Sequence, residues 1–487
     1  MADTTLDAII IGAGISGINS AYRFQEGLPG ATYAILEGRS EIGGTWSLFK
    51  YPGIRSDSDL HTFGFPWDPW SENRSIADAP SILRYVKGAA ERAGIDKHIR
   101  FNHQVKSLDW SSEHQHWKVN VVADGKDKIL YGRQIMMGTG YYDYKKGLNG
   151  KIPGIENFKG QVIHPQFWPE DLDYTDKKVV VIGSGATAVT IVPNMAEKAK
   201  SVTMVQRSPS YFLPIPLVEP LDILIKKFLP SSWAFKVIRL KYYIMGFIFF
   251  IFCRMFPKKM IATLRKATEA ELPGNIPFDP HFVPNYLPWQ QRMCITPGGD
   301  FFAALRSGKA DVVTDTINTV TEKGLQLNSG KTIDADIIIT ATGLKILFGG
   351  GIKFYVDGQL QNLGEKYIWR GAVLQDLPNL AFVFGYTNAS WTLGADATGQ
   401  LWVRILKNLK AKGQTSFVAR VGEKETMKPR PLLNLNSTYI KEAEKEGSLP
   451  KGGDHGPWVP RSYWLKDILH AKFGDVSTGL QFNRVSS

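Results

Sequence analysis

The stretch Ala8-Ile-Ile-Ile-Gly12-Ala-Gly14-Ile-Ser-Gly17 decides the fold of this 487-residue chain. An apolar, strand-like run leads into a GxGxxG pattern, and a helix-compatible segment, residues 18–25, follows it. In such a loop the first glycine, Gly12, permits a tight turn, and the second, Gly14, lets the backbone approach a pyrophosphate. The third, Gly17, permits close packing of a helix whose N-terminus faces the phosphates. Strand, loop and helix together predict a dinucleotide-binding site.

An acidic residue completes this first pattern. The strand-like residues 32–36 end at Glu37, twenty residues after Gly17. A carboxylate at this place accepts hydrogen bonds from ribose hydroxyls. A glycine pattern alone is weak evidence, but the added acid favours a nucleotide site over a purely structural turn.

A second glycine pattern follows the apolar residues 179–182. Its loop contains Gly183, Ser184, Gly185, Thr187 and Ala188, and Ala188 stands where the third glycine would be. The next strand-like segment ends in Arg207 and Ser208 rather than in an acid. An arginine pairs with a 2′-phosphate that a carboxylate would repel, so this site is predicted to bind NADPH rather than NADH. Arg207 as an ordinary surface charge is the alternative.

Two dinucleotide sites in one chain indicate that electrons pass from a nicotinamide to a second carrier, most simply FAD. Disulfide reductases send these electrons to a nearby cysteine pair, but Cys253 and Cys294, the two cysteines of the chain, are far apart in sequence. Oxygen or a quinone remains as the acceptor. Productive use of oxygen requires a fixed cation beside the flavin and protection from water.

The domain organisation follows from a further repetition. Similar apolar elements, residues 134–140 and 337–343, close the two halves and indicate crossings between domains. We predict an α/β fold with two Rossmann-like dinucleotide-binding domains and a helical insertion. The predicted parts are 1–145 and 344–487 for the FAD-binding domain with a C-terminal extension, 150–210 and 289–343 for the NADPH-binding domain, and 211–288 for the basic and apolar insertion.

Composition excludes several classes of protein. Hydrophobic residues make up 43% and charged residues 21%, which excludes a disordered tail, a collagen or a coiled coil. Two cysteines, Cys253 and Cys294, are not enough for a disulfide framework, so we expect the protein to work in a reducing compartment. They also lie too far apart in sequence for a paired zinc or redox motif, so we expect no metal site. Residues 1–7 carry acids instead of a basic leader, so we expect no signal peptide and a cytoplasmic location.

The positive charge is concentrated in one segment. Formal net charge is +12, and residues 226–266 hold ten Lys or Arg and no Asp or Glu, so the other residues sum to only +2. This location argues against a nucleic-acid partner. Inside the segment, the uncharged run 242–253 is shorter than the roughly 20 residues that span a bilayer. We expect either an in-plane anchor that contacts anionic lipid, hence possible membrane association, or a buried helix lining a substrate tunnel.

Two longer motifs carry a family resemblance. Phe158-Lys-Gly160-Gln-Val-Ile-His164-Pro-Gln-Phe-Trp168-Pro169 resembles the FxGxxxHxxxW(P/D) fingerprint of type I Baeyer–Villiger monooxygenases, flavin enzymes that convert ketones into esters or lactones. Residues 43–57 are similar to the GGxWxxxx(Y/F)PGxxxD signature of the same family. The resemblance covers nearly the whole chain and is strongest to the subgroup of the ethionamide-activating monooxygenase.

The resemblance implies roles for individual residues. Arg292 matches the arginine that holds the C4a-peroxyflavin as an anion, and Asp57 matches the carboxylate that positions this arginine. These roles are physically coherent because an arginine stays protonated even when buried. The signature also places three residues at the cofactor, namely Gly44, Thr45 and Trp46.

We expect other motif residues to have structural or binding roles. We expect His164, with Phe158, Gly160 and Trp168, to form a hinge or to hydrogen-bond between domains rather than to catalyse. Trp391 either faces the substrate or packs in the core. Gln291 stands where many family members have a lysine that helps to bind the 2′-phosphate, which weakens the expected preference for NADPH.

The resulting interpretation is a monooxygenase that uses FAD, NADPH and O2 to insert one oxygen atom next to a ketone carbonyl. We expect apolar ketones as substrates and sulfoxidation as a side activity, and we make no prediction about the oligomeric state. The alternatives are a flavin-containing N- or S-monooxygenase, an NADPH-quinone oxidoreductase and, outside enzymes, a flavin-binding sensor.

Overall fold

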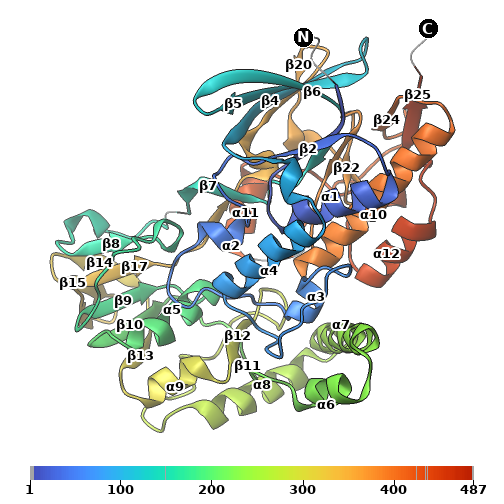
Figure 1. Ribbon diagram of the computed structural model, residues 1–487. Helices are drawn as coiled ribbons and strands as arrows, with labels where there is room; N and C mark the ends of the chain where they lie inside the picture. The colour runs from blue at the N-terminus through green and yellow to red at the C-terminus, as the bar shows by residue number, and fades with distance from the viewer. Residues whose placement is uncertain (1–4, 149, 424, 434, 436, 485–487) are drawn as a thin grey trace.

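Two β-sheets organise the chain, and each contains one of the glycine loops (Figure 1). The computed structural model describes residues 5–148, 150–423, 425–433, 435 and 437–484. In both sheets, parallel strands alternate with helices along the sequence. The predicted α/β class with two dinucleotide-binding folds is therefore confirmed.

The first sheet combines a parallel part with an antiparallel extension. Its strand order is β20 (Gln359–Leu360), β19 (Lys353–Val356), β4 (His103–Ser111), β5 (His116–Ala123), β6 (Lys126–Met137), β1 (Leu6–Ile11), β2 (Tyr33–Leu36) and β3 (Ile99–Arg100), with β23 (Leu380–Phe382) also paired to β6. Strands β3, β2, β1, β6 and β23 are parallel. Strands β4 and β5 form an antiparallel meander with β6.

Helices from both ends of the chain cover the parallel part of this sheet. Helix α1 (Ile15–Gly27) packs on α10 (Trp391–Ala411), and α10 packs on α12 (Trp464–Phe473). The rings of Phe24 and Trp402 stack with their centroids 5.2 Å apart in the core. The C-terminal segment thus contributes β23 and α10 to the same layers as β1 and α1. Burial of such aromatic side chains supplies about 1.5–3 kcal/mol each.

The second sheet is parallel and smaller. Its order is β13 (Ala310–Thr314), β10 (Ser201–Gln206), β9 (Lys178–Ile182), β17 (Ile337–Thr340) and β8 (Gln161–Ile163). Helices α5 (Ala186–Ala196) and α9 (Asp300–Arg306) pack on it, and an antiparallel sheet of β14 (Ile317–Thr321), β15 (Gly324–Leu327) and β16 (Thr332–Asp334) follows. The central strands of the parallel sheet, β9 and β17, are continuous apolar runs because both of their faces are covered.

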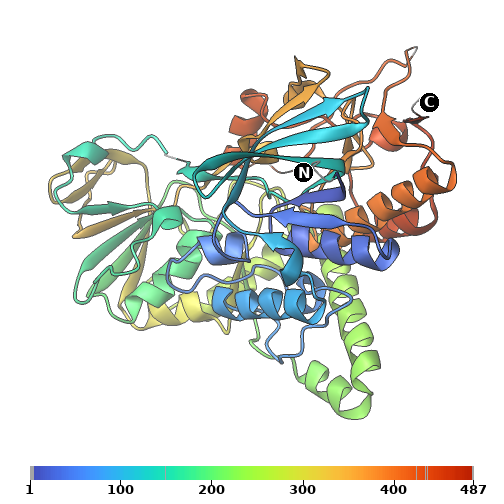
Figure 2. The same ribbon diagram turned by 45° about the horizontal axis from the view of Figure 1, so that its top comes forward.

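A helical segment is inserted between β11 (Phe212–Ile215) and β12 (Cys294–Pro297), which pair in parallel. It contains α6 (Pro220–Phe228), α7 (Ser231–Met255) and α8 (Pro257–Glu271). Figure 2 shows α6 and α7 projecting from the rest of the molecule, while α8 packs against β11. Helix α7 is 25 residues long and includes the uncharged run 242–253. Among the helices that the structure describes, none is long and apolar enough to cross a membrane.

The two predicted crossings lie side by side. Strand β7 (Tyr142–Gly147) follows the first crossing, β18 (Leu344–Ile346) follows the second, and the two pair antiparallel. The β7/β18 and β11/β12 pairs lie near the predicted boundaries, which supports the five-part division of the chain that we propose.

The remaining α-helices and strands are α2 (Thr45–Leu48), α3 (Leu60–Phe63), α4 (Ala79–Arg92), α11 (Thr438–Lys445), β21 (Ile368–Trp369), β22 (Val373–Leu374), β24 (Ser416–Ala419) and β25 (Leu480–Asn483).

The packing of α1 on the first glycine loop gives a test of the fold. A Cβ atom at residue 17 would lie 1.8 Å from the carbonyl oxygen of Gly12, so Gly17→Ala must push the helix away from the loop. We expect the free energy of unfolding to fall by about 2–4 kcal/mol in denaturant titrations. Gly246→Ala is the control, since nothing lies within 4 Å of that position on α7. Equal stability of both variants would contradict the close packing.

Candidate active site

A cavity of about 1070 Å³ is lined by both glycine loops. The structure brings most of the predicted site residues to its wall: Gly12, Gly14, Glu37, Gly44, Thr45, Trp46, Asp57, His164, Gly185, Thr187 and Arg292. In the part of the chain that the structure describes, the wall does not include Gly17, Phe158, Gly160, Trp168, Gly183, Ser184, Ala188, Arg207 or Ser208. These remaining residues shape or flank the site rather than line it.

The first glycine loop reaches the cavity through backbone contacts. Gly12 has φ +99°, and a Cβ atom there would lie 2.7 Å from the carbonyl oxygen of Gly138. A Cβ atom on Gly14 would lie 3.5 Å from the Cα atom of Gly44, so the two loops meet at this point. Helix α1 begins just after Gly14, and its N-terminal N–H groups face the cavity wall. This arrangement suits an anionic pyrophosphate.

Glu37 lies at the end of β2, as the pattern predicts. Its Oε2 accepts a hydrogen bond from the Ala13 N–H at 2.7 Å, and its Oε1 accepts one from the Arg39 N–H at 3.0 Å. Burial raises the pKa of Glu37, and these backbone donors oppose the shift. Glu37 therefore stabilises the loop, while its contact with a ribose remains a prediction.

Arg39 fixes the segment that begins at Gly44. Its guanidinium donates to the Gly44 carbonyl oxygen at 3.1 Å and to Ser47 Oγ at 2.8 Å. Thr45 starts α2, and the ring of Trp46 packs edge-on against Phe63 at 5.6 Å. This segment is thereby held against the cavity.

The second glycine loop has open space beside it. Gly185 is the N-cap of α5, and no protein atom lies within 4 Å of where its Cβ atom would be. Gly183 and Ala188 pack inward, Gly183 against the carbonyl oxygen of Ala341. Ser184 Oγ donates to the Ser208 carbonyl oxygen at 2.7 Å. The exposed Arg207 follows β10 directly, so its guanidinium is accessible at the edge of the loop.

Arg292 is one of several basic residues on the cavity wall, which also carries Arg39, Arg55, Lys106, Lys145 and Lys146. Much of the surface of Arg292 is accessible, because the side chain opens into the cavity. Its Nη2 donates to the Tyr386 carbonyl oxygen at 3.4 Å. Desolvation opposes its charge, but the neighbouring Tyr141, Tyr439, Tyr142 and Asp57 outweigh that effect and raise the pKa of Arg292. The guanidinium is therefore positive at any working pH.

Asp57 shares the cavity with Arg292. Burial raises the pKa of Asp57, and the charges of Arg292 and Arg55 partly offset this effect. Between described residues, no hydrogen bond or ion pair joins Asp57 to Arg292; Arg55 pairs with Asp300 instead. The influence of Asp57 on Arg292 is therefore electrostatic, and its positioning role remains a prediction.

A group of tyrosines at Arg292 was missed from the sequence. Tyr141 and Tyr142 place their hydroxyl oxygens 2.5 Å apart, and Trp391 stacks on the Tyr141 ring with centroids 5.0 Å apart. Burial raises the pKa of Tyr141 to about 12, so its hydroxyl stays protonated. The available signal was the position of both tyrosines directly after the first domain crossing.

A narrow recess of about 20 Å³ extends from the cavity beside Arg292. It shares Tyr141, Arg292, Trp391 and Tyr439 with the cavity wall. Its other walls are mainly apolar, formed by Phe384, Gly385, Tyr386, Thr387, Leu433, Leu435 and Ile440. The tip of the cavity thus joins one positive charge to apolar surface.

The fingerprint residues lie in the second lobe, with His164 next to the crossing at Gly343, and their role as a hinge remains a prediction. One His164 ring nitrogen, Nε2, lies 3.3 Å from the Gly343 carbonyl oxygen, and Nδ1 accepts from the Gln166 N–H at 3.2 Å. Burial lowers the pKa of His164, so the ring is neutral at pH 7. Phe158 is buried, a Cβ atom on Gly160 would lie 2.3 Å from the Asp336 carbonyl oxygen, and Trp168 packs on the core of the second sheet.

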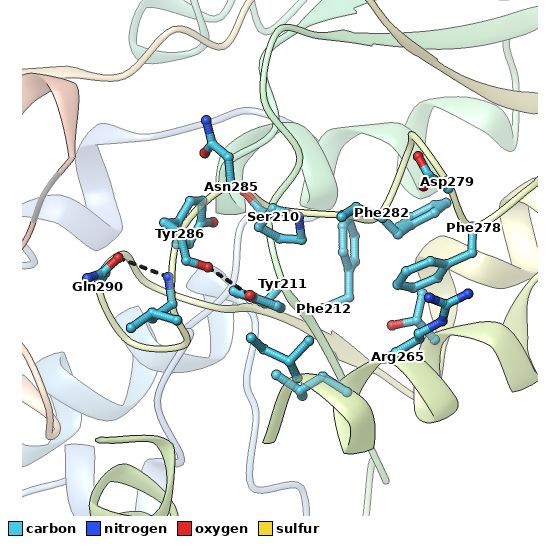
Figure 3. Close-up of a pocket in the computed structure, with 16 residues that line it drawn as sticks. Ser210, Tyr211, Phe212, Arg265, Phe278, Asp279, Phe282, Asn285, Tyr286 and Gln290 are labelled. Atoms are coloured by element: carbon cyan, nitrogen blue, oxygen red, sulfur yellow. Dashed lines mark hydrogen bonds between the residues drawn. The ribbon is translucent and has the colours of Figure 1, made fainter. Parts of the chain in front are cut away.

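A second cavity, of about 450 Å³, lies between α8 and residues 278–290 (Figure 3). Tyr211 donates its hydroxyl to the Tyr286 carbonyl oxygen at 2.7 Å across it. Ser210 lines both cavities, but Arg292 and Asp57 line only the larger one. The predicted catalytic residues therefore belong to the larger cavity.

Comparisons with known proteins identify the family. The sequence profile of the flavin-binding monooxygenase-like family matches residues 7–227. The chain is 45% identical to the FAD-containing monooxygenase EthA of Mycolicibacterium smegmatis, over 96% of this chain and 95% of that protein. This chain belongs to the flavin-binding monooxygenase-like family. The probable FAD-binding monooxygenase AlmA of Acinetobacter is a further relative, 40% identical over 96% of this chain and 95% of its own length.

Solved structures share the fold of this flavin-binding monooxygenase. An oxidised steroid monooxygenase bound to NADP superposes with a TM-score of 0.75 at 19% identity, covering 99% of this chain and 100% of that one. The polycyclic ketone monooxygenase of Thermothelomyces thermophila gives a TM-score of 0.76 at 18% identity, covering 100% of this chain and 91% of that one. The sequence-based prediction of a flavin-dependent monooxygenase is confirmed.

The accessible Arg207 predicts the cofactor preference. We expect Arg207→Ala to lower kcat/KM for NADPH by about tenfold to hundredfold, because one charge-assisted pair with the 2′-phosphate is lost. The value for NADH, which lacks this phosphate, stays unchanged. Arg133→Ala, at another exposed arginine, is the control for steady-state assays with both nucleotides. An equal loss with NADH and NADPH would contradict the role of Arg207.

The raised pKa of Asp57 predicts a pH dependence. Below that pKa the carboxyl group is neutral, so kcat/KM of the wild type falls toward acid pH with an apparent pKa above the usual 3.8. Asp57→Asn cannot titrate, so its profile is lower and lacks this acid-side fall. Because ionisation is harder in the folded state, the same variant unfolds at higher denaturant concentration at pH 7. If Asp57→Asn shows the same fall in kcat/KM at acid pH as the wild type, the titrating group is another residue and the prediction is wrong.

Proposed function

We propose that this protein is a Baeyer–Villiger monooxygenase that uses FAD, NADPH and O2 to convert an apolar ketone into an ester or lactone. In the overall reaction, ketone, O2, NADPH and one proton give the ester, NADP⁺ and water. One observation carries the proposal: Arg292, a permanent cation, stands in a cavity that both glycine loops line and that ends in an apolar recess.

The residues present fit the two cofactors. The loop from Gly12 to Gly17, with Glu37 and the segment 44–57, would hold FAD at the N-terminus of α1. The loop from Gly183 to Ala188, with Arg207 and Ser208, would hold NADPH, and the open space at Gly185 leaves room for its pyrophosphate. FAD, when reduced by NADPH, supplies the electrons that activate dioxygen.

Arg292 supplies the electrostatic part of the chemistry. Its guanidinium donates a hydrogen bond to the Tyr386 carbonyl oxygen, so the protein itself contributes to orienting the cation toward oxygen on which negative charge develops. A pre-oriented donor in such a site contributes about 2.7–4 kcal/mol to transition-state stabilisation. The Asp57 carboxylate acts on the guanidinium through its charge and helps keep it oriented.

The wall of the larger cavity supports an apolar ketone as the substrate. Trp46, Leu344 and Leu347 lie on the same wall as Arg292, so a ketone whose carbonyl oxygen faces the guanidinium can place its alkyl groups against apolar side chains. Trp391 lies on both the cavity and the recess, which favours a substrate-facing role over pure core packing.

A second candidate is oxidation at sulfur or nitrogen, because the family profile covers flavin-binding monooxygenases in general. Soft heteroatoms take up electrophilic oxygen without a carbonyl adduct. We propose sulfoxidation as a side activity, and an assay of one linear ketone and one aryl thioether ranks the two reactions. Sulfoxide formation without any ester would reject the Baeyer–Villiger proposal. NADPH oxidation that depends on quinone and is indifferent to oxygen would reject both in favour of a quinone reductase.

Replacement of Arg292 tests the central residue. We expect Arg292→Ala to retain NADPH-dependent bleaching of the flavin in anaerobic stopped-flow experiments, since neither loop is altered. Ester output falls about hundredfold to thousandfold because the pre-oriented cation is gone. Arg292→Lys, which keeps the charge without the forked geometry, recovers part of this loss. Ester formation by Arg292→Ala at the wild-type rate would refute the role.

A further inference from the structure

Helices α6 and α7 pack on the protein through charged groups as well as through the apolar residues Ala234, Ile238 and Cys253 of α7. Asp222 is buried and accepts hydrogen bonds from Lys241 Nζ and, at 2.8 Å, from the Tyr242 hydroxyl. Arg239 donates to the carbonyl oxygens of His61 at 2.6 Å and Gly64 at 2.9 Å. A surface helix normally turns its apolar stripe inward and its polar face outward. Much of the anchoring of this helix pair instead uses charged side chains.

The outward side of the same two helices is apolar. Phe228, Trp233 and Ile248 are 72%, 62% and 60% exposed. Along α7 the exposed apolar residues recur every three or four positions, which places them on one stripe. We define the outer face by these residues and their exposed neighbours on α6 and α7: Leu221, Ile223, Leu224, Phe228, Trp233, Val237, Leu240, Ile244, Met245, Phe247, Ile248 and Met255.

Helix α12 extends the outer face. The ring of Trp464 packs against that of Tyr243, with centroids 4.5 Å apart. The rings of Tyr463 and Phe247 also pack together, with centroids 5.7 Å apart. Beyond this contact α12 exposes Leu465, Leu469 and Phe473, at successive turns, with Phe473 78% exposed. Figure 1 shows α6, α7 and α12 on the same side of the molecule. Contiguous apolar surface of this extent marks an interaction site.

Basic side chains accompany this surface, and acids are absent from residues 223–268. Six of the basic residues are exposed and take part in no ion pair of the described chain: Lys227, Lys236, Arg254, Lys258, Lys259 and Lys266. Arg265 is different, because it pairs with Glu269 and lies over the Phe278 ring at the second cavity (Figure 3). The segment therefore offers apolar and positive groups together and no negative ones.

We propose that the outer face and α12 dock on the surface of a bilayer that contains anionic lipid, with the helices lying in the plane of the interface. Aromatic and aliphatic side chains then enter the acyl boundary, and the lysines contact the headgroups. A second copy of the chain fits less well, since a two-fold contact would bring the same positive charges together. The alternative of a tunnel wall lacks support, because residues 242–253 do not line the larger cavity.

Flotation of the purified holoenzyme with vesicles tests the proposal. We expect the wild type to float with vesicles that contain phosphatidylglycerol, to bind phosphatidylcholine vesicles weakly, and to dissociate as salt concentration rises. The triple variant Trp233→Ser/Leu240→Ser/Ile248→Ser loses about tenfold or more in the vesicle-bound fraction. Ile129→Ser/Leu360→Ser is the matched control, since these residues are exposed apolar positions on β6 and β20, and it floats like the wild type.

Two further measurements test the proposal: the turnover of the triple variant, and the vesicle binding of a variant that lacks two lysines. Monooxygenase turnover of the triple variant stays at the wild-type level, because none of its positions lines the larger cavity. Lys258→Gln/Lys259→Gln, which leaves the apolar stripe intact, lowers binding to phosphatidylglycerol vesicles and weakens the salt dependence. Three outcomes overturn the proposal: no flotation of the wild type, equal flotation of the triple variant, or a concentration-dependent dimer in sedimentation velocity that the triple variant abolishes while vesicle binding is unchanged.

Discussion

The whole arrangement depends on backbone approaching backbone at the ends of two strands. Gly12 comes so close to Gly138, and Gly183 to Ala341, that neither position accommodates a side chain. This closeness lets α1 and α5 begin directly beside their sheets, with their N-terminal N–H groups at one shared cavity. Each lobe thus presents a positive helix end, and the space between them suits two phosphate-bearing ligands at once.

Within that space, the charge of Arg292 is the chemical centre. Burial makes an isolated charge costly, yet the carbonyl of Tyr386 and the neighbouring tyrosines favour the protonated guanidinium. The residue is therefore both permanently positive and pre-oriented, the two properties that stabilisation of an oxygen anion requires.

The sequence predicted those features that depend on local chemistry. The spacing of Gly12, Gly185 and Glu37 is the one that a nucleotide-binding strand, loop and helix unit requires. The fold class and the two cofactor loops could therefore be predicted from the sequence. The tyrosines around Arg292 could not, because they meet it only through tertiary packing. The exposure of apolar residues on α7 was equally hidden, since a run of apolar residues has the same composition whether it faces the core or the solvent.

The pairing of β7 with β18 has a consequence for motion. These strands are the two routes by which the chain passes from one lobe to the other, and they form a single antiparallel ribbon, supported by the bond from Thr342 Oγ1 to the Leu148 carbonyl oxygen at 2.8 Å. Two separate linkers would let the lobes swivel independently. A shared ribbon couples the two connections, so any displacement of one lobe against the other has to deform both strands together.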